Sequence, residues 1–263
     1  MPLSIAAFVP DSPLLIKEIN EQQTTETQRL ISSFEPLAHL IKCKNITTVI
    51  LISTGAENLP GAISILHDPV IYGDFNDFGR PDISLSLAHN IKIAYQMTEL
   101  LEHSNYPIKL LSQQKMDYTL LTPLLLLKEV INGLKIVPCI LQGPHESIIK
   151  FGKTIRRISE RSNENILLLA CGEICRTNNR RGKNPHLTIA QEHFSEKILS
   201  AIKNNQLANL LSYDEKQLKK FNAQSLATLQ TVASCINETK TTNTILAREV
   251  HLGINHLNVV FNL

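Results

Sequence analysis

The stretch AAFVPDSPLLI, residues 6–16, indicates the fold class. An apolar run that predicts a strand ends at Pro10, the chain turns through Asp11 and Ser12, and a second apolar segment starts after Pro13. A carboxylate at the C-terminal end of the first strand of an α/β protein lies where such folds bind ligands. Asp11 is therefore a candidate site residue, with an ordinary turn former as the alternative.

The rest of the chain alternates between strand and helix patterns. Short apolar runs bounded by turn residues predict strands at 3–9, 46–53, 61–66, 108–111, 134–140, 165–171, 244–250 and 254–262. Apolar residues three to four apart predict helices at 25–43, 84–103, 145–161, 187–204 and 223–237. This alternation predicts an α/β fold, a three-layer α/β/α sandwich with a mostly parallel central sheet, and the last two strands predict a closing hairpin. The sequence has no linker and no repeat, so we expect residues 1–263 to form a single domain.

Composition narrows the function classes. The chain has 26 Lys and Arg against 24 Asp and Glu, a net charge of +2, so we expect no nucleic-acid and no membrane partner. There is no signal-peptide pattern, and the longest apolar run, 120–127, is too short to span a bilayer. Five cysteines without a CxxC pair predict reduced thiols in a cytoplasmic protein.

Three loops are expected to meet at one crevice. VPDSP (9–13), ISTGAENLPG (52–61) and ACGEICRTNNRRGKNP (170–185) each follow a predicted strand. The carboxyl ends of parallel strands share one edge of the sheet, so these loops should line the same crevice.

The stretch YGDFNDFGRPDIS, residues 72–84, precedes a predicted helix. Asp82 or Ser84 is a plausible N-cap for that helix, and Phe75 and Phe78 are expected to be buried anchors of a compact loop.

Six segments in order carry a resemblance to a known family. They are VPDSPLLI (9–16), ISTGA (52–56), GDFNDFGRPD (73–82), MDYTLLTPLLLL (116–127), ACGEICRTN (170–178) and REVHLGINHLNVVF (248–261). Over nearly its whole length the chain resembles the B-subunit type of class III extradiol ring-cleavage dioxygenases, the LigB/Memo-like group. The resemblance implies that group's α/β/α fold and oxidoreductase activity in the catabolism of aromatic compounds. It also implies non-haem Fe(II) held by two His and one Glu, with further His residues as acids and bases.

Most of the implied site positions hold other residues in this chain. The two ligand His positions fall on Asp11 and Gly55, and only the ligand carboxylate is kept, as Glu249. The acid/base motifs fall on four candidate catalytic residues, Asp117, Tyr118, Glu173 and Arg176. Fe(II) is the cofactor that the resemblance implies, and these exchanges argue against it here.

A metal site could persist in altered form. Asp11 and Glu249 offer two oxygen donors, which suit Mg²⁺ or Ca²⁺, and His251 would share a face with Glu249 in an extended segment. The alternative is that His251, between Val250 and Leu252, is a structural side chain.

The crevice loop is unusually basic. Arg176, Arg180 and Arg181 could bind an anionic small molecule, because guanidinium groups match carboxylate and phosphate geometry. The alternative is that a solvated loop collects basic residues. The same arginines could lower the pKa of the Cys175 thiol and make it a nucleophile, a weaker hypothesis.

Two functions remain open. The favoured one is a family member with a degenerate active site that has lost iron chemistry and binds a small, anionic molecule in the crevice. The other is a working dioxygenase with an atypical metal site using Asp11 and Glu249. A homodimer is implied by resemblance only.

Overall fold

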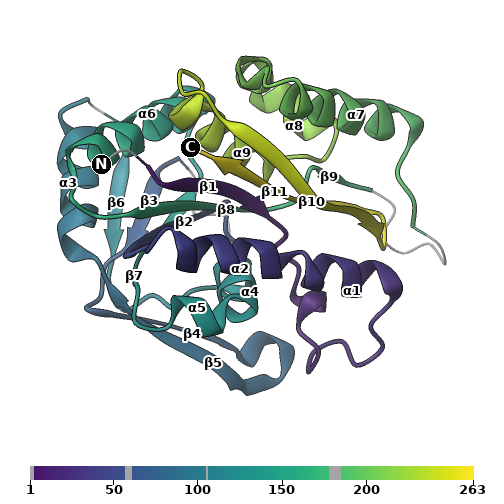
Figure 1. Cartoon of the computed structure of the whole chain (residues 1–263), viewed down its shortest axis with the longest axis horizontal. Helices are drawn as coiled ribbons and strands as arrows, with labels where there is room; N and C mark the ends of the chain where they lie inside the picture. The colour runs from purple at the N-terminus through teal and green to yellow at the C-terminus, as the bar shows by residue number, and fades with distance from the viewer. Residues whose placement is uncertain (1–2, 57–60, 105, 178–184) are drawn as a thin grey trace.

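The computed structural model describes residues 3–56, 61–104, 106–177 and 185–263, and its centre is a parallel sheet (Figure 1). Four neighbouring strands run in the same direction: β1 (Ile5–Val9), β8 (Ile166–Cys171), β2 (Thr48–Ser53) and β7 (Lys135–Leu141). All residues of β1, β2 and β8 are buried. Continuous apolar runs are typical of strands covered on both faces, and this explains why these strands could be predicted from sequence.

Other strands extend the sheet on both sides. Next to β1 lie β11 (Ile254–Asn262) and β10 (Thr242–His251), which form the predicted closing hairpin. Next to β7 lie β3 (Ile63–Leu66) and β6 (Ile108–Leu111). The remaining described strands are β4 (Val70–Phe75), β5 (Arg80–His89) and β9 (Cys175–Arg176).

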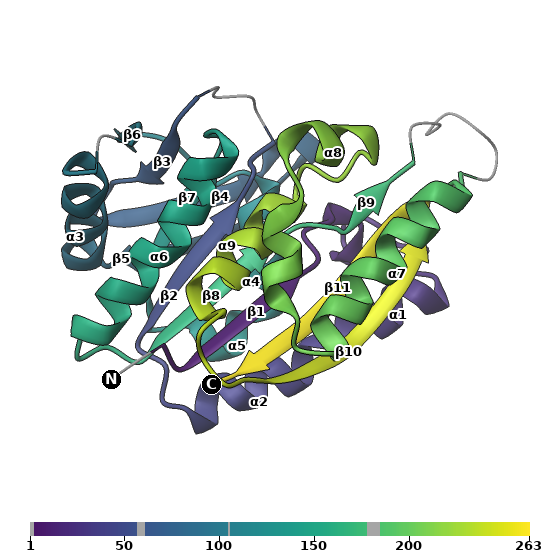
Figure 2. The same cartoon turned by 90° about the horizontal axis from the view of Figure 1, so that it is seen from above.

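Helices cover both faces of the sheet, as the two views in Figure 1 and Figure 2 make plain. One face carries α1 (Thr25–Ser32), α2 (Phe34–Cys43), α4 (Tyr118–Leu126) and α5 (Lys128–Ile131). The other carries α3 (Ile91–Glu102), α6 (His145–Arg161), α7 (Ile189–Lys203), α8 (Glu215–Lys220) and α9 (Leu226–Ile236). Short 3-10 helices are η1 (Pro13–Leu15), η2 (Asn76–Phe78) and η3 (Leu207–Ser212). The predicted α/β/α class with a largely parallel sheet is confirmed.

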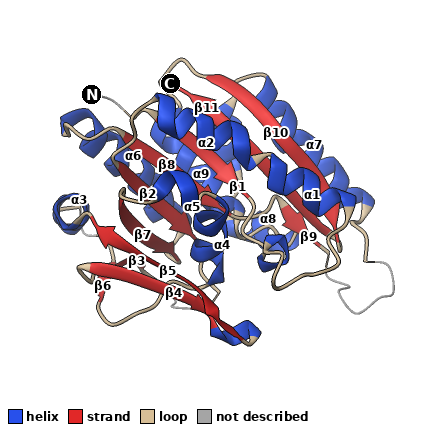
Figure 3. Ribbon diagram, turned by 60° about the horizontal axis from the view of Figure 1, so that its bottom comes forward, coloured by secondary structure: helices blue, strands red, loops and turns tan. Residues whose placement is uncertain are grey.

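The segment 72–89 differs from its prediction. It forms the β4–β5 hairpin, which projects away from the sheet in Figure 3, and α3 begins only at Ile91. The N-cap is Asn90, whose Oδ1 accepts from Ile93 N at 3.2 Å. The predicted caps Asp82 and Ser84 are therefore wrong, because Ile83 and Leu87 also fit the alternating pattern of a strand.

Two further predictions need correction. The expected helix 25–43 is divided at Ser33, which ends α1 and begins α2. Phe75 is buried, but Phe78 is 40% exposed, so only one of the two predicted anchors lies in the core. No helix in the described ranges is long and apolar enough to cross a membrane.

Candidate active site

Asp11, Glu173 and Arg176 lie together at the carboxyl ends of β1 and β8. Gly172 N donates to Val9 O at 3.0 Å, and the β1–β8 register runs to Val9 opposite Cys171. Asp11 and Glu173 are the second residues beyond this pair, and both are buried. The Arg176 guanidinium forms an ion pair with the Glu173 carboxylate. Two buried carboxyl groups and one guanidinium therefore lie together at the edge of the sheet where the crevice was predicted.

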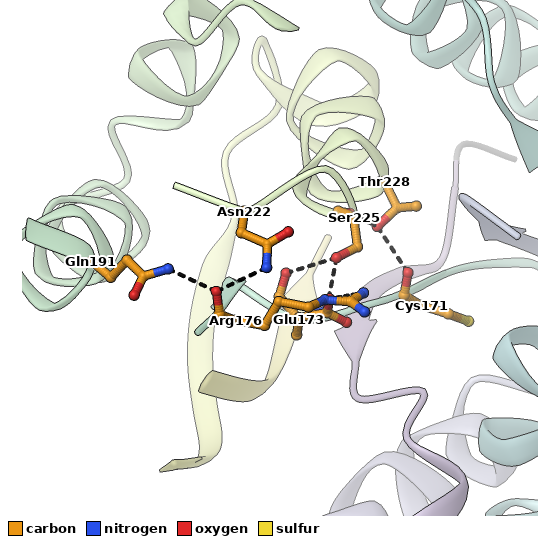
Figure 4. Close-up of polar contacts among 7 residues, drawn as sticks. All are labelled: Cys171, Glu173, Arg176, Gln191, Asn222, Ser225 and Thr228. Carbon is orange, nitrogen blue, oxygen red and sulfur yellow. Dashed lines mark hydrogen bonds and ion pairs between the residues drawn. The ribbon is translucent and has the colours of Figure 1, made fainter. Parts of the chain in front are cut away.

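The loop that carries Glu173 and Arg176 is held by side chains from α7 and from the segment between α8 and α9 (Figure 4). Gln191 Nε2 donates to Arg176 O at 2.7 Å, and Asn222 Nδ2 donates to the same oxygen at 3.1 Å. Ser225 Oγ donates to Glu173 O at 3.3 Å. These bonds fix the backbone that aims the ion pair into the crevice, because buried carbonyl groups need partners.

The electrostatics of Asp11 follow from its surroundings. Burial first, and then the nearby charge of Glu173, raise the pKa of Asp11 well above its ordinary value, while Arg176 acts in the opposite direction. Asp11 therefore keeps its proton to a higher pH than a solvated aspartate does. In that state it is a hydrogen-bond donor as well as an acceptor.

Asp117 and Tyr118 lie at the start of α4, next to this group. The Asp117 carboxylate caps α4 by accepting from Thr119 N at 2.9 Å, and it accepts from Ala56 N in the loop after β2 at 2.6 Å. Burial, followed by Asp11, raises the pKa of the Tyr118 phenol. Asp117 is thus committed to two backbone groups, whereas Tyr118 keeps a protonated hydroxyl near Asp11.

A cavity of about 230 Å³ opens beside Asp117 and Tyr118. Phe78 lies in its wall, with its ring centroid 5.4 Å from that of Tyr118, and Lys115 also contributes to the wall. Its lining therefore combines two aromatic rings with the carboxylates of Asp74, Asp77 and Asp117.

At Gly55 both the backbone conformation and the surrounding atoms exclude a side chain. Its φ is +74°, and a Cβ at this position would lie 2.9 Å from Ile140 Cγ2 and 3.6 Å from Asp117 Oδ2. The backbone conformation and the space both favour glycine. The loop after β2 is therefore packed in a way that leaves no room for a ligand side chain from residue 55.

Glu249 and His251 interact with α1 and its N-cap rather than with the Asp11 group. Glu249 Oε1 accepts from Arg29 Nη1 at 3.4 Å, and His251 Nδ1 lies 3.5 Å from Thr24 Oγ1. No group of three or more His, Cys, Asp or Glu side chains in the described ranges is placed to hold a metal ion. Metal binding by Asp11 and Glu249 stays a prediction, and no third donor joins them among the described residues.

His256 is a site residue that the sequence analysis missed. It lies opposite Glu249 in the β10–β11 hairpin, is 2% exposed, and its Nδ1 has no hydrogen-bond partner. Burial, then His251 and Arg176, lower its pKa to about 3, so its imidazole is neutral at pH 7. The turn at Leu252 and Gly253 fixes this register. Counting residues outward from that turn would have placed His256 opposite Glu249 from the sequence.

The donor set does not fit the Fe(II) site that the resemblance implies. Fe(II) in such sites needs two imidazoles and a carboxylate around open positions. Here residue 55 cannot ligate, a carboxyl group with a raised pKa stands at one imidazole position, and the nearby Arg176 guanidinium repels a cation. The positive charge of the crevice centre comes from Arg176.

The basic loop and the cysteines can be assessed in part. Arg180 and Arg181 lie outside the described residues, so anion binding by them stays a prediction. Burial raises the pKa of the Cys175 thiol, and its Sγ lies 3.3 Å from Ser195 Oγ. The hypothesis that the Cys175 pKa is lowered to give a nucleophilic thiolate is therefore wrong. All five cysteines are free, as predicted.

Fold and crevice define a mixed α/β protein with polar side chains gathered at the carboxyl ends of a parallel sheet. Residues 5–261 match the family described as the catalytic LigB subunit of aromatic ring-opening dioxygenase, and the chain belongs to this family. The predicted resemblance is confirmed.

Two relatives add to this. Protein CA_C1420 of Clostridium acetobutylicum is 22% identical over 221 residues, which are 79% of this chain and 46% of that protein. The chain thus spans less than half the length of this curated relative. The crystal structure of the uncharacterized protein JW3007 from Escherichia coli K12 has a TM-score of 0.69 at 14% identity, covering 98% of this chain and 99% of that one. This second likeness supports the fold.

Proposed function

We propose that this LigB-family protein does not carry out iron-dependent ring opening and that its crevice binds a small carboxylate through Arg176. The observation that carries the proposal is the Arg176 guanidinium among Asp11, Glu173 and Tyr118. A guanidinium there supplies a permanent positive charge without a metal ion.

Arg176 has capacity left for a ligand. Its Nη2 faces Glu173, while 32% of its side-chain surface is exposed. A guanidinium presents five N–H donors in a planar fork, so a ligand carboxylate can bind the edge that Glu173 leaves open.

Two neighbours support the same ligand class. The Tyr118 hydroxyl is an O–H donor, and the raised pKa of Asp11 favours the protonated carboxyl group, which would also donate. The aromatic wall formed by Phe78 and Tyr118 favours a carboxylate attached to a flat ring.

Glu173 opposes this ligand, and this gives a sharp test. Glu173 occupies one edge of Arg176 and repels an incoming anion, so Glu173→Gln should strengthen binding, whereas Arg176→Ala should abolish it. Arg156→Ala is the matched control, because its side chain is 31% exposed and paired with Glu160 at a distant position on α6.

The probe is benzoate, with benzamide as the uncharged analogue, and the readouts are calorimetric affinity and melting temperature. We expect benzoate to raise the melting temperature of the wild type and of Arg156→Ala, with a roughly tenfold tighter Kd in Glu173→Gln, or about 1.4 kcal/mol. Equal binding of benzamide, or benzoate binding that survives Arg176→Ala, would refute the carboxylate proposal.

A further inference from the structure

Two histidines meet near the other end of β7. His67 follows β3, and His89 is the last residue of β5, which pairs with Ile136 at the start of β7. Their ring centroids are 5.4 Å apart with an interplanar angle of 86°. The crevice lies beyond the carboxyl ends of the parallel strands, so this pair is separate from it.

The ring nitrogens of this pair have unused capacity. His89 is 6% exposed, and neither its Nδ1 nor its Nε2 has a partner in good hydrogen-bond geometry, although the Asp68 backbone lies close enough to act on the ring. His67 Nδ1 is also buried without a partner. A buried polar atom without a partner costs about 1–3 kcal/mol, so two such rings in contact need an explanation.

We infer that His67 and His89 together bind one divalent transition-metal ion of the zinc class. Neutral imidazole is the commonest protein ligand for such ions. Two imidazoles bound to one tetrahedral ion at about 2.0–2.1 Å have ring centroids about 5 Å apart, close to the spacing found here. No third His, Cys, Asp or Glu in the described ranges completes the group, so water or an external ligand fills the other positions.

Hydrogen bonds fix the backbone at both histidines. His67 N donates to Leu111 O at 2.8 Å, and His89 N donates to Pro69 O at 3.1 Å. Tyr95 packs against the His67 ring at 5.1 Å, and the Asp68 carboxylate, bound to Gln113 N at 2.8 Å, contributes a nearby negative charge. An ion here would link β3 to the β4–β5 hairpin.

The test is calorimetric titration of the full chain with Zn²⁺ alone, in a Cys43→Ser background. This background removes the donor pair formed by Cys43 and His39, whose Sγ and Nε2 atoms are 3.3 Å apart. The site variants are His67→Asn and His89→Asn, and the control is His103→Asn, an exposed residue that follows α3.

We expect one Zn²⁺ site whose affinity falls at least about tenfold in each site variant and is unchanged in His103→Asn. Zn²⁺ should also shift the ring nitrogen resonances of His67 and His89 together in NMR spectra. If His89→Asn does not fold, the Zn²⁺ affinity of His67→Asn is the test, because His67 is only half-buried. Unchanged Zn²⁺ affinity in His67→Asn, or no Zn²⁺ binding by the wild type, would overturn the inference.

Discussion

A carboxyl group taken out of water beside a second carboxyl group holds its proton, and Asp11 is in that position. Its pKa is raised by burial and by Glu173, so the folded state keeps a proton that the unfolded chain loses near its ordinary pKa of about 3.9. The unfolded state then binds fewer protons, and stability falls as pH rises above about 4 until the folded-state pKa is reached.

Asp11→Asn should remove this loss. We expect the free energy of unfolding of the variant to be less dependent on pH above about 4, and higher than that of the wild type at pH 7. Urea unfolding across that range measures it. Equal pH slopes for the two proteins would contradict a protonated Asp11.

The ion pair between Glu173 and Arg176 gives a second residue-scale prediction. Arg176→Ala leaves the Glu173 carboxylate buried without its partner, which should cost about 1–3 kcal/mol, a range reduced because Arg176 is one-third exposed. Adding Glu173→Gln should restore most of the loss in denaturant unfolding. No recovery in the double variant would show that Arg176 stabilises the fold by packing alone.

At the scale of elements, the loop after β2 depends on Gly55. Gly55→Ala should lower the free energy of unfolding by about 1–3 kcal/mol, since its positive φ and the nearby Ile140 both oppose a Cβ. Gly79→Ala is the matched control, because its φ is +71° and nothing lies within 4 Å of the added Cβ. Equal losses in the two variants would mean that contact with Ile140 contributes nothing.

The loop between β8 and β9 depends on Gln191. Its side-chain amide donates to Arg176 O and to Phe221 O, at 2.7 and 3.0 Å. Gln191→Ala should therefore cost about 1–3 kcal/mol and weaken benzoate binding, because two buried carbonyl groups lose a donor. A variant with the stability loss but full benzoate affinity would separate the loop's stability from the aim of Arg176.

Elements whose apolar pattern fits only one type of secondary structure were predictable from the sequence. Elements whose pattern fits both a helix and a strand were not. The core strands are continuous apolar runs, and α6 has a clear helical stripe, so both were predictable. The predicted helix 84–103 overlaps the second half of β5, because Ile83 and Leu87 fit both the helical and the strand period. The contacts of Glu249 with Arg29 were not predictable, since α1 and β10 meet only through tertiary packing.

At the scale of the whole molecule, the chain keeps the family's fold, and we propose that the chemistry at the carboxyl ends of β1 and β8 differs from iron-dependent ring opening. Asp11 was predictable as a candidate site position from the strand–turn pattern, whereas its closeness to Glu173 follows from the β1–β8 register. The loops after β1, β2 and β8 all contribute to the group around Arg176, so the proposal that Arg176 supplies the positive charge in place of a metal ion is tested on the intact chain.

The most direct measurement is the iron content of the protein after anaerobic loading with Fe(II) and desalting. It is made on the wild type and on His67→Asn, so that the histidine pair near the start of β7 is accounted for. We predict that His67→Asn retains far less than one iron per chain, because residue 55 offers no ligand and the Arg176 guanidinium beside Asp11 repels a cation. One iron per chain retained in His67→Asn and lost on Asp11→Ala would contradict the account.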